Sequence, residues 1–65
     1  MEERKKLSVV MEHWIEHNER HMTEYRRWAE KAGELGLAQA KAGIEGAIEK
    51  LLQCNHHLEK VLKAL

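Results

Sequence analysis

Three histidines stand at four-residue intervals in the stretch HWIEHNERH near the beginning of this chain: His13, His17 and His21. In a helix, residues four apart lie on one face, one turn above the other. Two imidazoles placed in this way can bind one transition-metal ion, such as zinc, nickel or copper. All three cannot bind the same ion, because eight residues of helix span about 12 Å.

The first five residues of that stretch also have the spacing H-x-x-E-H of one family of zinc proteases, with Glu16 in the place of the general base. A protease also needs a third ligand, a substrate cleft and a group that stabilises the transition state. A helical chain of 65 residues has no room for these parts. No nucleophile–base pair, phosphate-binding glycine loop or E-x-x-H di-iron pair is visible either. We therefore expect that the protein is not an enzyme.

The charge balance excludes further classes of protein. Eleven Lys and Arg residues are matched by eleven acidic residues, so the formal net charge is zero. A nucleic-acid-binding protein or a polybasic membrane-surface segment would show a basic stripe. No apolar run approaches the ~18 residues of a membrane span, and the charged start MEERKK leads into no signal-peptide core. We expect a cytoplasmic protein that binds neither nucleic acid nor membrane.

The elements that must position the histidines are helices. The sequence contains no proline and is dominated by Lys, Glu, Leu, Ala, Arg and Gln, which favour helix. Residues suited to a helix interface recur at alternating steps of four and three, the spacing of a seam along a helix. The first seam is Leu7, Met11, Trp14, Asn18, His21, Tyr25, Trp28 and Ala32. The second seam is Leu37, Ile44, Ile48, Leu51, Asn55, Leu58, Leu62 and Leu65, with Lys41 at its one non-apolar position between Leu37 and Ile44.

A glycine-containing stretch separates the two seams. Gly33 and Gly36 can adopt positive φ and end a helix. The sequence therefore predicts one domain, residues 1–65, with a first helix over about 3–32, a turn over about 33–36 and a second helix over about 37–64. So short a connection makes the helices antiparallel neighbours. The predicted fold class is all-α, an antiparallel two-helix hairpin.

Folding the chain at about residue 36 brings Trp28 level with Glu45 and the small residues around it. Gly43 and Gly46 lie in that region, inside the second predicted helix, where each glycine costs about 1 kcal/mol relative to alanine. A large indole packed against small residues would explain them. Alternatively, the two glycines mark a local break in the helix.

The hairpin carries more apolar surface than a single interface can bury. Ile15 and Met22 flank the first seam, and Leu52 and Val61 flank the second. Small proteins without disulfides or metal commonly compensate by oligomerising. Two hairpins that form a homodimeric four-helix bundle with two-fold symmetry are the simplest solution.

Two interpretations of the polar residues remain open. Asn18, His21 and Asn55 interrupt otherwise apolar seams at one level of the hairpin, so they are predicted to form a buried polar layer that specifies register. Alternatively, His17 and His21 bind a metal ion, joined by His13 or by Cys54, which the fold brings close. Cys54 is otherwise a small buried residue.

The motif HWIEHN..H...Y..WA resembles the core of a short uncharacterised helical domain of bacteria and archaea. The residues that carry the resemblance are His13, Trp14, Ile15, Glu16, His17, Asn18, His21, Tyr25, Trp28 and Ala29. That domain occurs alone and C-terminal to small nickel-binding accessory proteins of the carbon monoxide dehydrogenase system. The match covers about residues 13–32, and beyond it only Asn55 and the leucines that follow look similar.

The resemblance implies nickel or a related metal, with His13, His17 and His21 as the motif histidines. The known nickel ligand of those accessory proteins lies at a Met-Cys start, whereas this chain begins Met-Glu. The leading hypothesis is therefore a non-enzymatic interaction or assembly module without a cofactor. Its partner would be a second copy of the chain or another protein. The alternative is a small accessory protein that binds nickel or zinc through His17 and His21.

Overall fold

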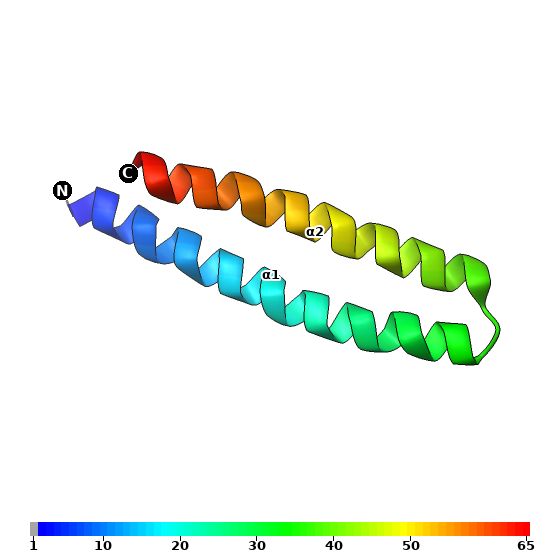
Figure 1. The fold of residues 1–65 in the computed structure, drawn as a ribbon. Coiled ribbons are helices and arrows are strands. Elements are labelled where there is room, and N and C mark those ends of the chain that lie inside the picture. The colour runs from blue at the N-terminus through cyan, green and yellow to red at the C-terminus, as the bar shows by residue number, and fades with distance from the viewer. Residues whose placement is uncertain (1) are drawn as a thin grey trace.

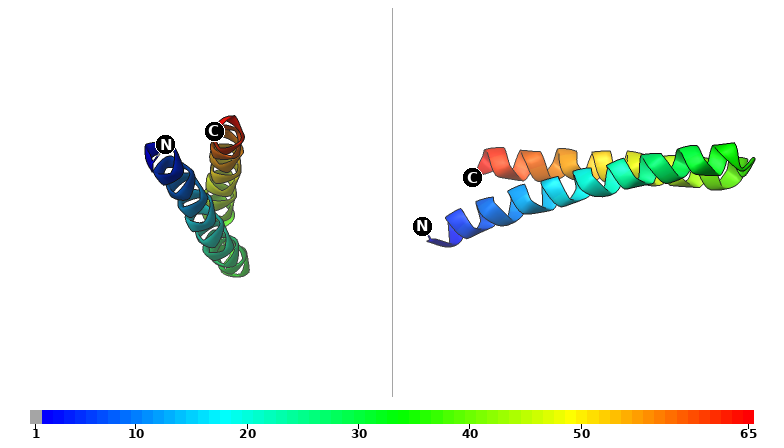
Figure 2. Two further views of the ribbon diagram at one scale, coloured as in Figure 1. Left: turned by 90° about the vertical axis from the view of Figure 1, so that its left-hand side faces the viewer. Right: turned by 90° about the horizontal axis from the view of Figure 1, so that it is seen from below.

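The computed structural model describes residues 2–65 as two α-helices joined by a short turn (Figure 1). Helix α1 spans Glu2–Glu34 and helix α2 spans Ala38–Ala64. The helices run antiparallel side by side, with the turn at one end, and at the other end the N-terminal part of α1 extends beyond the last turn of α2 (Figure 1 and Figure 2). The predicted all-α hairpin is confirmed. Helix α1 runs two residues past the predicted boundary, and α2 begins one residue later.

The turn is closed by Gly36, whose φ of 76° lies in the left-handed region. The backbone amide of Leu37 donates to the carbonyl of Ala32 at 2.9 Å, and that of Gly36 donates to the carbonyl of Gly33 at 3.0 Å. This pair of bonds is the Schellman arrangement that satisfies the last carbonyls of a helix. A residue with a Cβ is strained at this φ, so a glycine is required there.

The interface between the helices is one continuous seam along each of them. On α1 the buried and half-buried residues are Ser8, Met11, Ile15, Asn18, Met22, Tyr25, Ala29 and Ala32. On α2 they are Ile44, Ala47, Ile48, Leu51, Asn55, Leu58, Leu62 and Leu65. The α2 seam is the predicted one with Ala47 added and Leu37 removed, since Leu37 is exposed beside the turn.

The α1 seam differs from the prediction by a rotation of the helix about its axis. Half of the predicted positions are exposed, namely Leu7, Trp14, His21 and Trp28. Their C-terminal neighbours take their places in the interface, namely Ser8, Ile15, Met22 and Ala29. The predicted seam and the observed seam both step by four and three residues, and they share Met11, Asn18, Tyr25 and Ala32. The spacing alone therefore does not distinguish them. The observed set has smaller side chains at both ends, which allow the two helix axes to approach closely.

Two predictions about packing are wrong. Trp28 does not lie in the hairpin core, because its side chain is 57% exposed and a Cβ added at Gly43 or Gly46 would meet no atom within 4 Å. Ile15 and Met22 are not left on the surface, since both face α2. The alternative of a break in α2 is also excluded, because the helix is continuous through both glycines.

The hairpin has a thin core. It measures 52 × 15 × 11 Å, and among residues 2–65 no large side chain is fully buried. The buried apolar residues are Met11, Met22, Ala29, Ala32 and Ile48. In the described part of the chain, neither helix has an apolar stretch long enough to cross a membrane.

Candidate functional site

A pair of asparagines crosses the middle of the hairpin. Asn55 of α2 is 6% exposed, and its Oδ1 accepts a hydrogen bond of 2.8 Å from Nδ2 of Asn18 on α1. Nδ2 of Asn55 donates in turn to the backbone carbonyl of Ile15 at 3.2 Å. Within residues 2–65, no buried side-chain nitrogen or oxygen lacks a partner. The two amides therefore tie the helices at one register, because a slip by one residue would leave both without partners.

His21 lies outside this asparagine layer, contrary to the prediction that it belongs there. Its ring is exposed on α1, in a row with His13, His17 and Tyr25. The ring centroids of His17 and His21 are 4.5 Å apart, and those of His13 and His17 are 5.9 Å apart. The histidine row (His13, His17, His21) thus runs along the surface of one helix, accessible to solvent.

Cys54 is exposed and lies beside Asn18, whose Nδ2 donates weakly to its Sγ at 3.7 Å. It is not the small buried residue of the sequence-based interpretation. Across residues 2–65, no three His, Cys, Asp or Glu side chains gather closely enough to hold a metal ion. Within the described residues of one chain, the histidine row therefore offers at most pairs of ligands, and Cys54 does not complete a group of three with them.

The exposed half of the predicted α1 seam belongs to a larger apolar face, which runs the length of the hairpin. Helix α1 contributes Leu7, Val10, Trp14, His21 and Trp28 to this apolar face. Helix α2 contributes Ala40, Ala47, Cys54 and Val61. Two observations place the α1 residues and the α2 residues on the same side of the hairpin. Cys54 contacts Asn18, and Tyr25 lines a surface hollow with Ala40 and Ala47.

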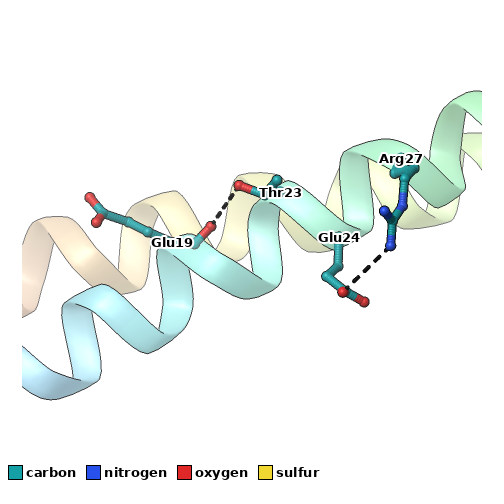
Figure 3. A network of polar contacts seen from close by, with 4 residues as sticks. All are labelled: Glu19, Thr23, Glu24 and Arg27. Carbon is teal, nitrogen blue, oxygen red and sulfur yellow. Dashed lines mark hydrogen bonds and ion pairs between the residues drawn. The ribbon is translucent and has the colours of Figure 1, made fainter.

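The other sides of the hairpin have a different character. A hollow on the opposite side is lined by Arg26, Ala29, Glu30, Lys41, Glu45 and Ile48, so charged groups surround it. On the outer surface of α1, Arg27 pairs with Glu24 at 3.6 Å and Thr23 donates to the carbonyl of Glu19 (Figure 3). Both groups of that ion pair are largely exposed, and such pairs contribute little stability. Among the described residues, the exposed large apolar side chains on the apolar face are Leu7, Val10, Trp14, Trp28 and Val61, whereas Val9 and Leu52 lie elsewhere on their helices and Leu35 and Leu37 lie at the turn.

Sequence reasoning placed the two tryptophans in the wrong interface and so missed this face. The signal was present, because α1 carries two overlapping seams that share Met11, Asn18, Tyr25 and Ala32. A helix with two such seams has two sides suited to packing, and the hairpin occupies only one of them. Trp14 is 48% exposed and Trp28 57%, which is unusual for residues with so much apolar area.

Comparisons with known proteins identify a family without a described activity. A family model with the description "Domain of unknown function (DUF8180)" matches residues 7–65, nearly the whole chain. No curated protein and no solved structure matches.

Proposed function

We propose that this chain, which belongs to the DUF8180 family, is a non-enzymatic assembly module whose hairpins dimerise into a four-helix bundle. The observation that carries the proposal is the apolar face, with Trp14 and Trp28 largely exposed on it. Contiguous apolar surface of this kind marks an interaction site, whereas single exposed apolar residues do not. The charged groups on the other sides direct association to this one face.

The exposed area of the chain also supports association. The accessible surface is 5330 Å² for a mass of 7.6 kDa. A compact monomer of that mass would expose about 4,300 Å². The excess of about 1,000 Å² is comparable to the ~800 Å² that each partner buries in a standard protein interface. A second copy covering the apolar face would remove an area of this size.

The direction of the apolar face fits a bundle. With 100° per residue, the strip through Trp14 and His21 lies roughly 70° around α1 from the middle of the residues that face α2. In a four-helix bundle, each helix packs against two nearly parallel or antiparallel neighbours, and the directions toward these two neighbours make roughly a right angle. Helix α1 thus has one stripe for α2 and a second for a helix of another hairpin. Cys54 and Val61 provide the corresponding second stripe on α2.

Sedimentation equilibrium and thermal melts over a hundredfold dilution test the proposal. We expect a dimer whose melting temperature falls on dilution, because association stabilises the folded state by mass action. Trp14→Ala should shift the equilibrium toward monomer, and Val9→Ala, which removes an exposed side chain outside the apolar face, should not. A monomer with a concentration-independent melt would refute dimerisation.

A second candidate function is the binding of nickel or zinc by His17 and His21. Two imidazoles on one tetrahedral ion, with metal–nitrogen bonds of about 2.0–2.1 Å, have ring centroids roughly 5 Å apart. The observed 4.5 Å is close to this spacing. One chain would supply two ligands, and water or a second copy would complete the coordination. The choice of nickel rests on the resemblance of the HWIEHN motif.

Calorimetric titration of untagged protein with Ni²⁺ and Zn²⁺ tests this candidate. Stoichiometric binding that disappears in His17→Ala and His21→Ala, and persists in the control His57→Ala on α2, would support it. Binding should also raise the melting temperature of the parent. If neither ion releases heat or shifts the melt, the metal function is wrong.

A further inference from the structure

The apolar face contains a hollow of about 470 Å³ near the turn end. It is lined by Tyr25, Ala40, Gly43, Ile44 and Ala47. Three of these residues are alanine or glycine, and a Cβ added at Gly43 would meet no atom within 4 Å. The hollow is therefore open, apolar and shaped by small side chains, and no side chain of its own hairpin fills it.

Trp28 stands on the same face at the level of this hollow. The asparagine layer puts Asn18 level with Asn55. Trp28 on α1 and Glu45 on α2 each lie ten residues from that layer toward the turn, so they are at the same level. Glu45 lies within the stretch of α2 that lines the hollow. The indole does not line the hollow of its own chain, because it is 57% exposed and lies beside the charged residues Glu30, Lys31 and Glu34 of its own helix.

A two-fold dimer of hairpins through the apolar face has two arrangements. If the axis runs parallel to the helices, both turns lie at the same end and α1 packs against α2 of the second copy. If the axis is perpendicular to the helices, the turns lie at opposite ends and α1 packs against α1. Only the first keeps residues of the two copies at the same level.

Complementarity of size distinguishes the two arrangements. With the turns at the same end, Trp28 of each copy meets the alanine- and glycine-lined hollow of the other, so large packs on small. With the turns at opposite ends, the α1 strips with their indoles face each other, and the α2 strips with the small residues Ala47 and Cys54 face each other. Well-packed cores pair large residues with small ones.

Building on the dimer proposed above, we infer that two copies associate with their turns at the same end, with Trp28 of each copy seated in the hollow of the other. The hollow around Gly43 is thus a binding site for an indole of a second copy. This explains a tryptophan and a helical glycine that have no packing role within one chain.

Two glycine substitutions test the seating of the indole. An added Cβ meets no atom of the chain at Gly43 or at Gly46, but only Gly43 lines the hollow. Gly43→Leu should fill the hollow and weaken dimerisation at least about tenfold, as blocking a central aromatic anchor does. Gly46→Leu, the matched control, should leave the dimer dissociation constant unchanged. Equal effects of the two substitutions would overturn the inference.

A distance measurement tests the orientation separately. Leu35 lies in the turn and is exposed, so Leu35→Cys in a Cys54→Ala background can carry a spin label. With the turns at the same end, helix spacings of 8–10 Å predict a label separation of roughly 15–30 Å. With the turns at opposite ends, the separation would approach the 52 Å length of the hairpin and refute this inference alone. No dipolar coupling at any concentration would refute the dimer as well.

Discussion

The asparagine layer predicts an asymmetry between two substitutions of similar chemistry. Asn18→Leu removes the donor that satisfies Oδ1 of Asn55, and this oxygen is then buried without a partner. Such a group lowers the free energy of unfolding by about 1–3 kcal/mol. Asn55→Leu instead puts an apolar side chain into the buried position and leaves Asn18, which is half-buried, free to bind water. We expect it to cost clearly less.

Thermal melts of both single variants and the double variant at one protein concentration measure the effect. Each kcal/mol corresponds to about 4–8 °C in melting temperature for a domain of this size. The double variant should be more stable than Asn18→Leu, because no polar group is then stranded. His21→Leu in either background should not change this coupling, since the hydrogen bonds of Asn18 and Asn55 do not involve His21. If the two single variants cost the same and their effects add in the double variant, the hydrogen bond between the asparagines does not form.

Three further substitutions separate the contributions of the turn, the helix and the core. Gly36→Ala should lower stability by about 1–2 kcal/mol in a urea titration, because alanine is strained at positive φ, and a neutral result would contradict the turn geometry. Gly46→Ala should raise stability by up to about 1 kcal/mol through helix propensity, whereas the packing against Trp28 expected from the sequence would make it a loss. Met22→Ala should cost about 2–5 kcal/mol, since this side chain is 4% exposed between the helices, and a small loss would show that the predicted seam through His21 faces α2 after all.

The sequence by itself determined the two helices, the turn between them and the level of the hairpin at which the asparagine layer lies. The helix-favouring composition and the alternating steps of four and three residues indicate two long helices. The turn between them needs a glycine, and Gly36 provides it. Asn18 and Asn55 interrupt their seams at positions that any short turn near residue 36 brings together. These features follow from local preferences and from chain length, so they do not depend on how the helices are rotated.

Only the tertiary structure decided which side of α1 faces α2. The spacing gives the period of a seam. It does not say which side of the helix faces the partner when two seams share residues, as the two seams of α1 share Met11, Asn18, Tyr25 and Ala32. Burial selected the seam with Ile15 and Met22, whose flexible or compact side chains fit between two close helices. Trp14, Trp28 and His21 were thereby left outside, because a single partner helix covers only one side of α1.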